Sequence, residues 1–216
     1  MTKSKLLTAL MIAKRNHAFL ATAIDGLLQQ TFSDHLLLIV HDSSNNRLSE
    51  ILYNYQAREP TRIRILENRG FSLVDAFNYG LSQVSTPYTA QVDCSSVSHC
   101  TRFAIQLTIL NRTPEIGLVG TQSQLIDENG NLIAGTETRY PLQHKIITHQ
   151  IEKRFRAICN SSVMFRTDLM IKTGGYNRID EYSQNNQHWL QISKRSQIAN
   201  LPNILVYNRI RNVPIL

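Results

Sequence analysis

Apolar runs of strand length alternate with stretches of helical periodicity along the first half of the chain. Strands are expected at residues 6–13, 35–40, 62–66 and 88–92, and the first two are nearly continuous apolar runs. Between them apolar side chains recur every three or four residues, as at Phe19, Ala23 and Leu27. Continuous apolar runs are typical of strands buried on both faces, and their alternation with helices predicts a mainly parallel sheet with right-handed crossovers. The fold class expected is therefore α/β, with a Rossmann-like sheet flanked by helices.

The pattern changes after residue 110. Further strands are expected at 116–126, 162–166, 198–201 and 204–210, and helices at 141–155 and 184–194. Glu-Asn-Gly-Asn at 128–131 is a hairpin signal, and Thr-Gly-Gly-Tyr at 173–176 ends a helix. Because the chain has no internal repeat and no low-complexity linker, residues 1–216 are expected to form one domain.

The stretch from Tyr88 to Cys100 holds the strongest candidate chemistry. Its strand ends at Asp93, and ligands of open α/β sheets bind just beyond the carboxyl ends of strands. A carboxylate at that point is well placed to meet a metal–phosphate group. The next residues, Cys94, Ser95 and Ser96, are not anionic oxygen ligands, so one acid stands where such a site needs two or three.

Composition narrows the class of protein. The chain is long enough for one sizeable core, and no apolar run approaches the ~18 residues of a membrane span. The apolar run at 6–13 resembles a signal peptide after Lys3 and Lys5, but it is short and leads into Lys14 and Arg15 without a cleavage site. Three cysteines without the spacing of a disulfide framework favour a reducing, cytoplasmic location.

The net charge of +7 favours phosphate-bearing or acidic partners, although a soluble surface with excess Lys and Arg explains it equally well. The basic residues are scattered and form no stripe interleaved with aromatic side chains, so nucleic-acid binding is not indicated.

Short motifs follow one another along nearly the whole chain, and in this order they resemble glycosyltransferase family 2, whose members have the GT-A fold. The motifs are QQTF (29–32), LLIVHDSSN (37–45), ENRGFS (67–72), FNYGL (77–81), YTAQVD (88–93), TPEIGLVGTQSQLIDENGNLI (113–133), NSSVMFR (160–166), GGYN (174–177), HWLQI (188–192) and IANLP (198–202). The resemblance implies a hexosyltransferase class of enzyme, of the kind used in polysaccharide biosynthesis, which moves a sugar from a nucleoside diphosphate with Mg²⁺ or Mn²⁺. It also implies a nucleotide-binding half at 1–110 and an acceptor-side half at 111–216.

On this resemblance, several positions are expected to bind substrate. Asp42 matches the residue that contacts the base, and Arg69 lies in the loop after the third strand, where it can meet a phosphate or the base. Arg15 lies in the turn after the first strand, in a segment that lacks the family's base-stacking aromatic residue. Asp93 and Ser95 occupy the positions of the metal-binding Asp-x-Asp motif.

The departures from the family fall where the chemistry is expected. The second acid of the metal motif is Ser95, and the Glu-Asp pair that holds the catalytic base is Gln184-Asn185. In the motif at 160–166, Asn160 stands where many members have His. An amide cannot accept a proton at neutral pH, so general-base help of about 10²–10⁴-fold is lost. Losing the metal removes charge stabilisation of the departing diphosphate, of the order of several kcal/mol.

The sequence therefore predicts a family 2-like domain, with no metal site, that binds a nucleotide or nucleotide-sugar and has lost most or all transfer activity. The alternative is a non-catalytic scaffold or regulatory domain that binds another protein, a pseudoenzyme kept for its shape.

Three smaller alternatives accompany this reading. Cys94, His99 and Cys100 invite a zinc site, but they lack recognisable ligand spacing. Asp180 and Glu181 are candidates for a displaced base, against the more ordinary reading of exposed loop charges. Trp189 is expected in the core and not as a platform for a sugar ring. A further expectation is that Asp42 and Asp93 lie at the same edge of the sheet and face one cleft.

Overall fold

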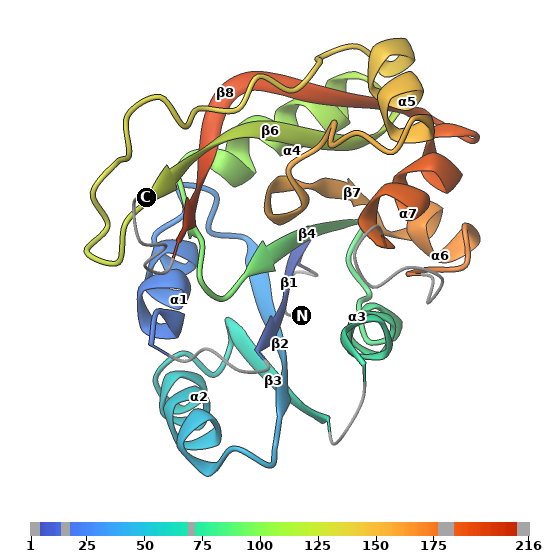
Figure 1. Cartoon of the computed structure of the whole chain (residues 1–216). Helices are drawn as coiled ribbons and strands as arrows, with labels where there is room; N and C mark the ends of the chain where they lie inside the picture. Colours follow the sequence, from blue (N-terminus) through green and yellow to red (C-terminus); the bar gives the residue numbers. More distant parts are fainter. Residues whose placement is uncertain (1–4, 14–17, 69–71, 177–183, 211–216) are drawn as a thin grey trace.

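The computed structural model describes residues 5–13, 18–68, 72–176 and 184–210, with the side chains of 184–188 left undescribed. One eight-stranded sheet runs through these residues in the order β3-β2-β1-β4-β7-β6-β8-β5, with helices on both faces (Figure 1). The strands are β1 (Leu7–Ala13), β2 (His35–Asp42), β3 (Ile63–Asn68), β4 (Tyr88–Asp93), β5 (Val97–Ser98), β6 (Ile116–Ile126), β7 (Met164–Arg166) and β8 (Gln197–Arg209). The helices are α1 (Leu20–Leu28), α2 (Asn46–Arg58), α3 (Leu73–Ser82), α4 (Arg102–Arg112), α5 (His144–Glu152), α6 (Thr167–Lys172) and α7 (Gln184–Ser193), with a 3₁₀ turn, η1, at Asn160–Ser162.

The first four strands form the parallel half of the sheet that the sequence predicts. β1 pairs in parallel with both β2 and β4, and β2 pairs in parallel with β3. Two of the connecting helices carry side-chain caps: Asn45 accepts from the backbone N–H of Leu48, and Ser72 accepts from that of Asp75. These bonds satisfy N–H groups that the first helical turn leaves unpaired, so the helix starts are fixed locally.

Hydrophobic clusters cover the two faces of the sheet. Along β1, Leu7, Ala9 and Met11 belong to one cluster while Leu10 belongs to the other, as the alternation of side chains along a strand requires. Trp189 is fully buried in the second cluster, which confirms its predicted place in the core. Within the described residues, every helix is too short or too polar to cross a lipid bilayer.

The second half departs from the expected boundaries at several elements, most clearly at its last strand. The two closing strands expected at 198–201 and 204–210 are a single strand, β8, paired in parallel with β6. Leu201 lies opposite Thr121 and Ile204 opposite Gln122, so Pro202 and Asn203 form a bulge. Proline has no N–H for the ladder, and a bulge accommodates it without ending the strand.

The helix expected at 141–155 is shorter, at His144–Glu152. Pro141 and Leu142 are instead held by β8, because their carbonyl oxygens accept from the side chain and the backbone N–H of Asn200. The strand expected at 162–166 begins later, at Met164, after the 3₁₀ turn η1. The short strand β5 was not predicted; it exists through its pairing with β8.

Two buried histidines in the parallel half are expected to make the stability of the protein depend on pH. His35 and His41 are 0% and 1% exposed, and burial is the main cause that lowers the pKa of each below 6.5. The two histidines bind protons more readily in the unfolded chain than in the folded one. Their contribution to the free energy of unfolding is therefore expected to be constant above about pH 6.5 and to fall as the pH drops below it.

His41 offers the sharper test, because neither of its ring nitrogens has a hydrogen-bond partner among the described residues. The variant His41→Leu is expected to gain about 1 kcal/mol of unfolding free energy and to lose part of the acid dependence. Urea unfolding at about pH 5.5 and about pH 7.5 measures both, and His149→Gln, at an exposed histidine, is the control. An acid dependence equal to that of wild type would exclude His41 as its source.

Candidate functional site

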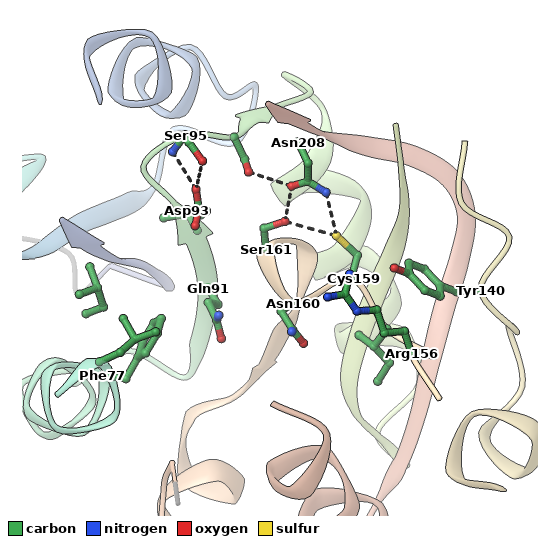
Figure 2. Close-up of a pocket in the computed structure, with 15 residues that line it drawn as sticks. Phe77, Gln91, Asp93, Ser95, Tyr140, Arg156, Cys159, Asn160, Ser161 and Asn208 are labelled. Atoms are coloured by element: carbon green, nitrogen blue, oxygen red, sulfur yellow. Dashed lines mark hydrogen bonds between the residues drawn. The ribbon is translucent and has the colours of Figure 1, made fainter. Parts of the chain in front are cut away.

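A cavity of about 370 Å³ lies at the carboxyl ends of β1 and β4. It is lined on one side by β4 and the turn after it and on the other by the chain between α5 and β7, with β8 behind (Figure 2). The lining residues are Ile12, Leu73, Phe77, Gln91, Val92, Asp93, Ser95, Ser96, Tyr140, Arg156, Ile158, Cys159, Asn160, Ser161 and Asn208. A partly apolar cleft with a few convergent polar groups, at the ends of parallel strands, is the usual form of a small-molecule site.

Asp93 is exposed at the edge of this cavity, and its side chain accepts hydrogen bonds from Ser95. Its Oδ1 accepts from the backbone N–H of Ser95 at 2.8 Å and from the Ser95 hydroxyl at 2.5 Å. Asp42 makes the same turn at the end of β2, where Oδ1 accepts from the N–H and hydroxyl of Ser44. Both carboxylates stand at the same edge of the parallel sheet, as predicted, but only Asp93 lines the described cavity.

Asn208 of β8 ties the two walls of the cavity together. Its Oδ1 accepts from the hydroxyls of Ser96 and Ser161, both at 2.8 Å, and its Nδ2 donates to Cys159 Sγ at 3.6 Å (Figure 2). Ser96 and Asn208 are 112 residues apart in sequence. One amide thus fixes the turn after Asp93 relative to the wall that follows α5.

The back of the cavity is a buried polar layer. The Tyr176 hydroxyl donates to Gln91 Oε1 at 2.8 Å, and its ring stacks on Phe77 with centroids 4.7 Å apart. Burial raises the pKa of Tyr176 far above its usual value, so this hydroxyl remains a donor. Deeper still, the fully buried Arg102 donates from Nη2 to the backbone oxygen of Gln91 at 2.9 Å. These bonds fix both the side chain and the backbone of Gln91.

The mouth of the cavity carries a positive charge. Arg156, from the chain after α5, supplies the positive charge among the described lining residues; it is exposed, and its side chain lies across the cavity from Gln91 (Figure 2). Tyr140 stands beside it; burial raises the pKa of this phenol, and the charge of Arg156 opposes the rise. A guanidinium at the opening is well suited to meet a phosphate or carboxylate.

The donor set around Asp93 does not fit a resident divalent cation. Ser95 offers a hydroxyl that already donates to Asp93, and burial together with the Asp93 charge raises the pKa of Cys94 to about 12, which keeps the thiol protonated. The His, Cys, Asp and Glu residues in the described part of the chain form no group of three that could hold a metal ion. His99 is engaged by the Thr101 hydroxyl at 2.8 Å, so the zinc alternative gains no support.

Of the residues predicted from sequence to act in a site, the structure brings Asp93 and Ser95 into the cavity. Arg15 and Arg69 lie outside the described residues, as do Asp180 and Glu181. Gln184 and Asn185 open helix α7, but their side chains belong to the undescribed set.

Arg156, Ser161 and Asn208 line the cavity and were missed by sequence reasoning. Arg156 belongs to the basic run Lys-Arg-Phe-Arg at 153–156, which was a usable signal for an anion site. Asn208 had no such signal in the sequence, because its role depends on the position of β8 in the folded protein. Asn160 also lines the cavity, and its Oδ1 accepts from Trp189 Nε1 at 3.0 Å.

A curled α/β sheet flanked by helices is the fold of GT-A glycosyltransferases, to which the similar solved structures belong. One solved structure with the same fold is S. aureus TarS with UDP-GlcNAc, with a TM-score of 0.75 and 11% identity over 96% of this chain and 59% of that one. Another is the mannosyltransferase PcManGT of Pyrobaculum calidifontis with GDP-Man and Mn²⁺, with a TM-score of 0.71 and 11% identity over 96% of this chain and 57% of that one.

Sequence comparison then places the chain within the class. The model of glycosyl transferase family 2 matches residues 8–174, and the chain belongs to this family. Among its relatives is the O-antigen biosynthesis glycosyltransferase WbnJ of Escherichia coli, 27% identical over 172 residues, which cover 79% of this chain and 65% of WbnJ. The chain thus spans less than two thirds of the length of WbnJ and of the two solved structures.

Proposed function

We propose that this domain binds a nucleoside diphosphate or nucleotide-sugar in the cavity beside Asp93 and that glycosyl transfer is lost or much reduced. The observation that carries the proposal is the pair Asp93–Ser95 in the cavity, at the position of the family's Asp-x-Asp motif with the second acid replaced by a hydroxyl. The neighbouring folds with UDP-GlcNAc or GDP-Man support a nucleotide-sugar as the ligand class.

Charge in the cavity supports an anionic ligand. Arg156 lies at the mouth, and Asp93 already accepts two hydrogen bonds from Ser95, which disperses its negative charge. We assign Arg156 to the diphosphate, because a guanidinium binds phosphate oxygens in pairs without a bridging cation. Asp42 is assigned to a base N–H, as the family pattern implies. Arg69 is assigned to a phosphate or the base, and Arg15 to a further contact with the substrate.

The reduced chemistry follows from the residues that replace acids. At Gln184 and Asn185 the amides have the shape of the Glu-Asp pair but cannot take a proton from a sugar hydroxyl. At Ser95 no carboxylate joins Asp93 to hold a cation against the departing diphosphate. In this proposal residues 1–110 hold the nucleotide and residues 111–216 form the acceptor side, where Arg156 and Asn208 complete the cavity.

Binding of UDP is expected to be weak and insensitive to metal. The Kd is expected to change by less than about threefold when EDTA replaces Mn²⁺, because Arg156 and not a cation meets the diphosphate. Isothermal calorimetry with UDP and GDP in both buffers measures this. Tight binding that vanishes in EDTA would reveal a metal site and contradict the proposal.

Charge removal at the cavity mouth provides the matched test. Arg156→Gln is expected to weaken UDP binding by about tenfold, the loss of one charge-assisted hydrogen bond. Arg112→Gln, at an exposed arginine on α4 outside the cavity lining, is expected to leave it unchanged. If the folded protein binds neither UDP nor GDP, the scaffold alternative replaces nucleotide binding.

A further inference from the structure

Helix α5 and the residues on either side of it present apolar and basic side chains together to solvent. Phe155 is 62% exposed, Ile146 48% and Leu142 42%. Ile147 and Ile151, on the opposite side of the helix, are buried in the core. We call the outward residues Leu142, Lys145, Ile146, His149 and Lys153–Arg156 the α5 surface.

The turn that ends α5 directs Phe155 outward. The N–H of Phe155 donates to Gln150 O and the N–H of Arg154 to Ile151 O, both at 2.9 Å, which is the hydrogen-bond pattern of a Schellman motif. Arg154 takes the left-handed position with φ 62°, where glycine is the usual residue. The apolar residue at the next position commonly packs back on the helix, whereas Phe155 stays mostly exposed. A strained turn that displays an aromatic ring is a feature associated with function.

The charge on this surface is one-sided. Between His144 and Arg156 there are four cations, Lys145, Lys153, Arg154 and Arg156, against the single acid Glu152. All four cations are exposed. Separately exposed apolar side chains among Lys and Arg are typical of surfaces that lie in the headgroup region of a bilayer, because a fluid bilayer needs no matching shape. A protein partner would instead favour one contiguous apolar patch.

We propose that the α5 surface docks on an anionic membrane, with Phe155 and Ile146 inserted among the headgroups and Lys145, Lys153 and Arg154 facing anionic lipid. Arg156 also lines the cavity mouth, and α5 lies at the outer edge of the molecule (Figure 1). Docking therefore places the cavity mouth close to the bilayer. The docking does not depend on nucleotide binding, so it stands or falls separately from the proposed function.

Co-sedimentation with vesicles tests the proposal. Wild type is expected to bind phosphatidylcholine vesicles with about 30% phosphatidylglycerol at least tenfold better than pure phosphatidylcholine, and to be released at about 0.5 M NaCl. Phe155→Ser is expected to lower binding by about tenfold, and the double variant Lys145→Gln/Lys153→Gln by about twentyfold. The controls are Ile171→Ser, at a side chain on α6 that is 53% exposed, and the double variant Arg58→Gln/Arg112→Gln.

Fluorescence of an introduced tryptophan locates the contact. In Phe155→Trp, brominated lipid is expected to quench emission, whereas in Ile171→Trp it is not; the native Trp189 is buried and serves as the common background. Equal binding to both kinds of vesicle, or full binding by Phe155→Ser, would overturn the proposal. So would a dimer in sedimentation velocity that Phe155→Ser dissociates, with no vesicle binding, since the surface would then join two copies of the chain.

Discussion

The variant Ser95→Asp/Gln184→Glu/Asn185→Asp is expected to bind UDP at least tenfold more tightly in Mn²⁺ than in EDTA, unlike the wild type. The Ser95 hydroxyl lies 2.5 Å from Asp93 Oδ1, so an aspartate there puts a second carboxylate beside the first. Two acids and the diphosphate oxygens then form the hard oxygen set that Mg²⁺ and Mn²⁺ prefer. The restored pair at 184 and 185 is expected to allow slow donor hydrolysis with water as the acceptor.

The same variant is expected to melt at a lower temperature than wild type without ligand, because neighbouring carboxylates repel when no cation lies between them. Mn²⁺ is expected to reverse that loss. The matched control has Ser95→Asn in place of Ser95→Asp, which keeps the shape and omits the charge. Calorimetric titration measures the Mn²⁺ affinity of the variant and of its control, and melting curves measure their stability. A folded triple variant that binds no more Mn²⁺ than the asparagine control would mean that the cavity has diverged beyond these residues.

Replacing Arg102 by alanine is expected to cost about 3–5 kcal/mol of unfolding free energy. The side chain is fully buried, and its guanidinium donates to Gln106 Oε1, Ser98 Oγ and the backbone oxygens of Gln91 and Val163. Burial lowers the pKa of Arg102 to about 10, which still leaves it charged at neutral pH. Alanine removes every one of these donors at once and leaves buried acceptors and a cavity.

The conservative and distant variants distinguish this network from a general effect of arginine. Arg102→Lys keeps the charge but not the planar fork of donors, so an intermediate loss is expected. Arg112→Ala, at an exposed position of the same helix, is expected to cost less than about 0.5 kcal/mol. Urea unfolding of the three variants measures the series. A loss for Arg102→Ala as small as that for Arg112→Ala would show that the buried bonds contribute no net stability.

The parallel half of the fold was predictable because its signals are local. The apolar run of β1 and the helical spacing of α1 each arise from a few neighbouring residues, and short connections then restrict the topology. The boundaries of α5 were not predictable, because Asn200 of β8 binds the carbonyl oxygens of Pro141 and Leu142. The bulge at Pro202 likewise depends on the register against β6.

The candidate site was predictable at Asp93 and Ser95, since strand, acid and polar turn follow one another in the chain. It was not predictable at Arg156 and Asn208. Arg156 reaches the cavity because the turn after α5 reverses the chain, and Asn208 because β8 runs the length of β6. Arg156 stands in a basic run that signals an anion site but does not show which cavity it lines, and Asn208 carries no sequence pattern that distinguishes it from an ordinary surface residue.

The sequence by itself determined the class of fold, the family and the place of Asp93 and Ser95 at a strand end, because periodicity, strand ends and motif order are properties of consecutive residues. Only the tertiary structure decided which side chains share the cavity, that Arg102 is buried beneath it, and that Phe155 and the basic residues around it lie at one surface. Those facts depend on hydrogen bonds and packing between segments as far apart as Ser96 and Asn208, which form only when the sheet is assembled.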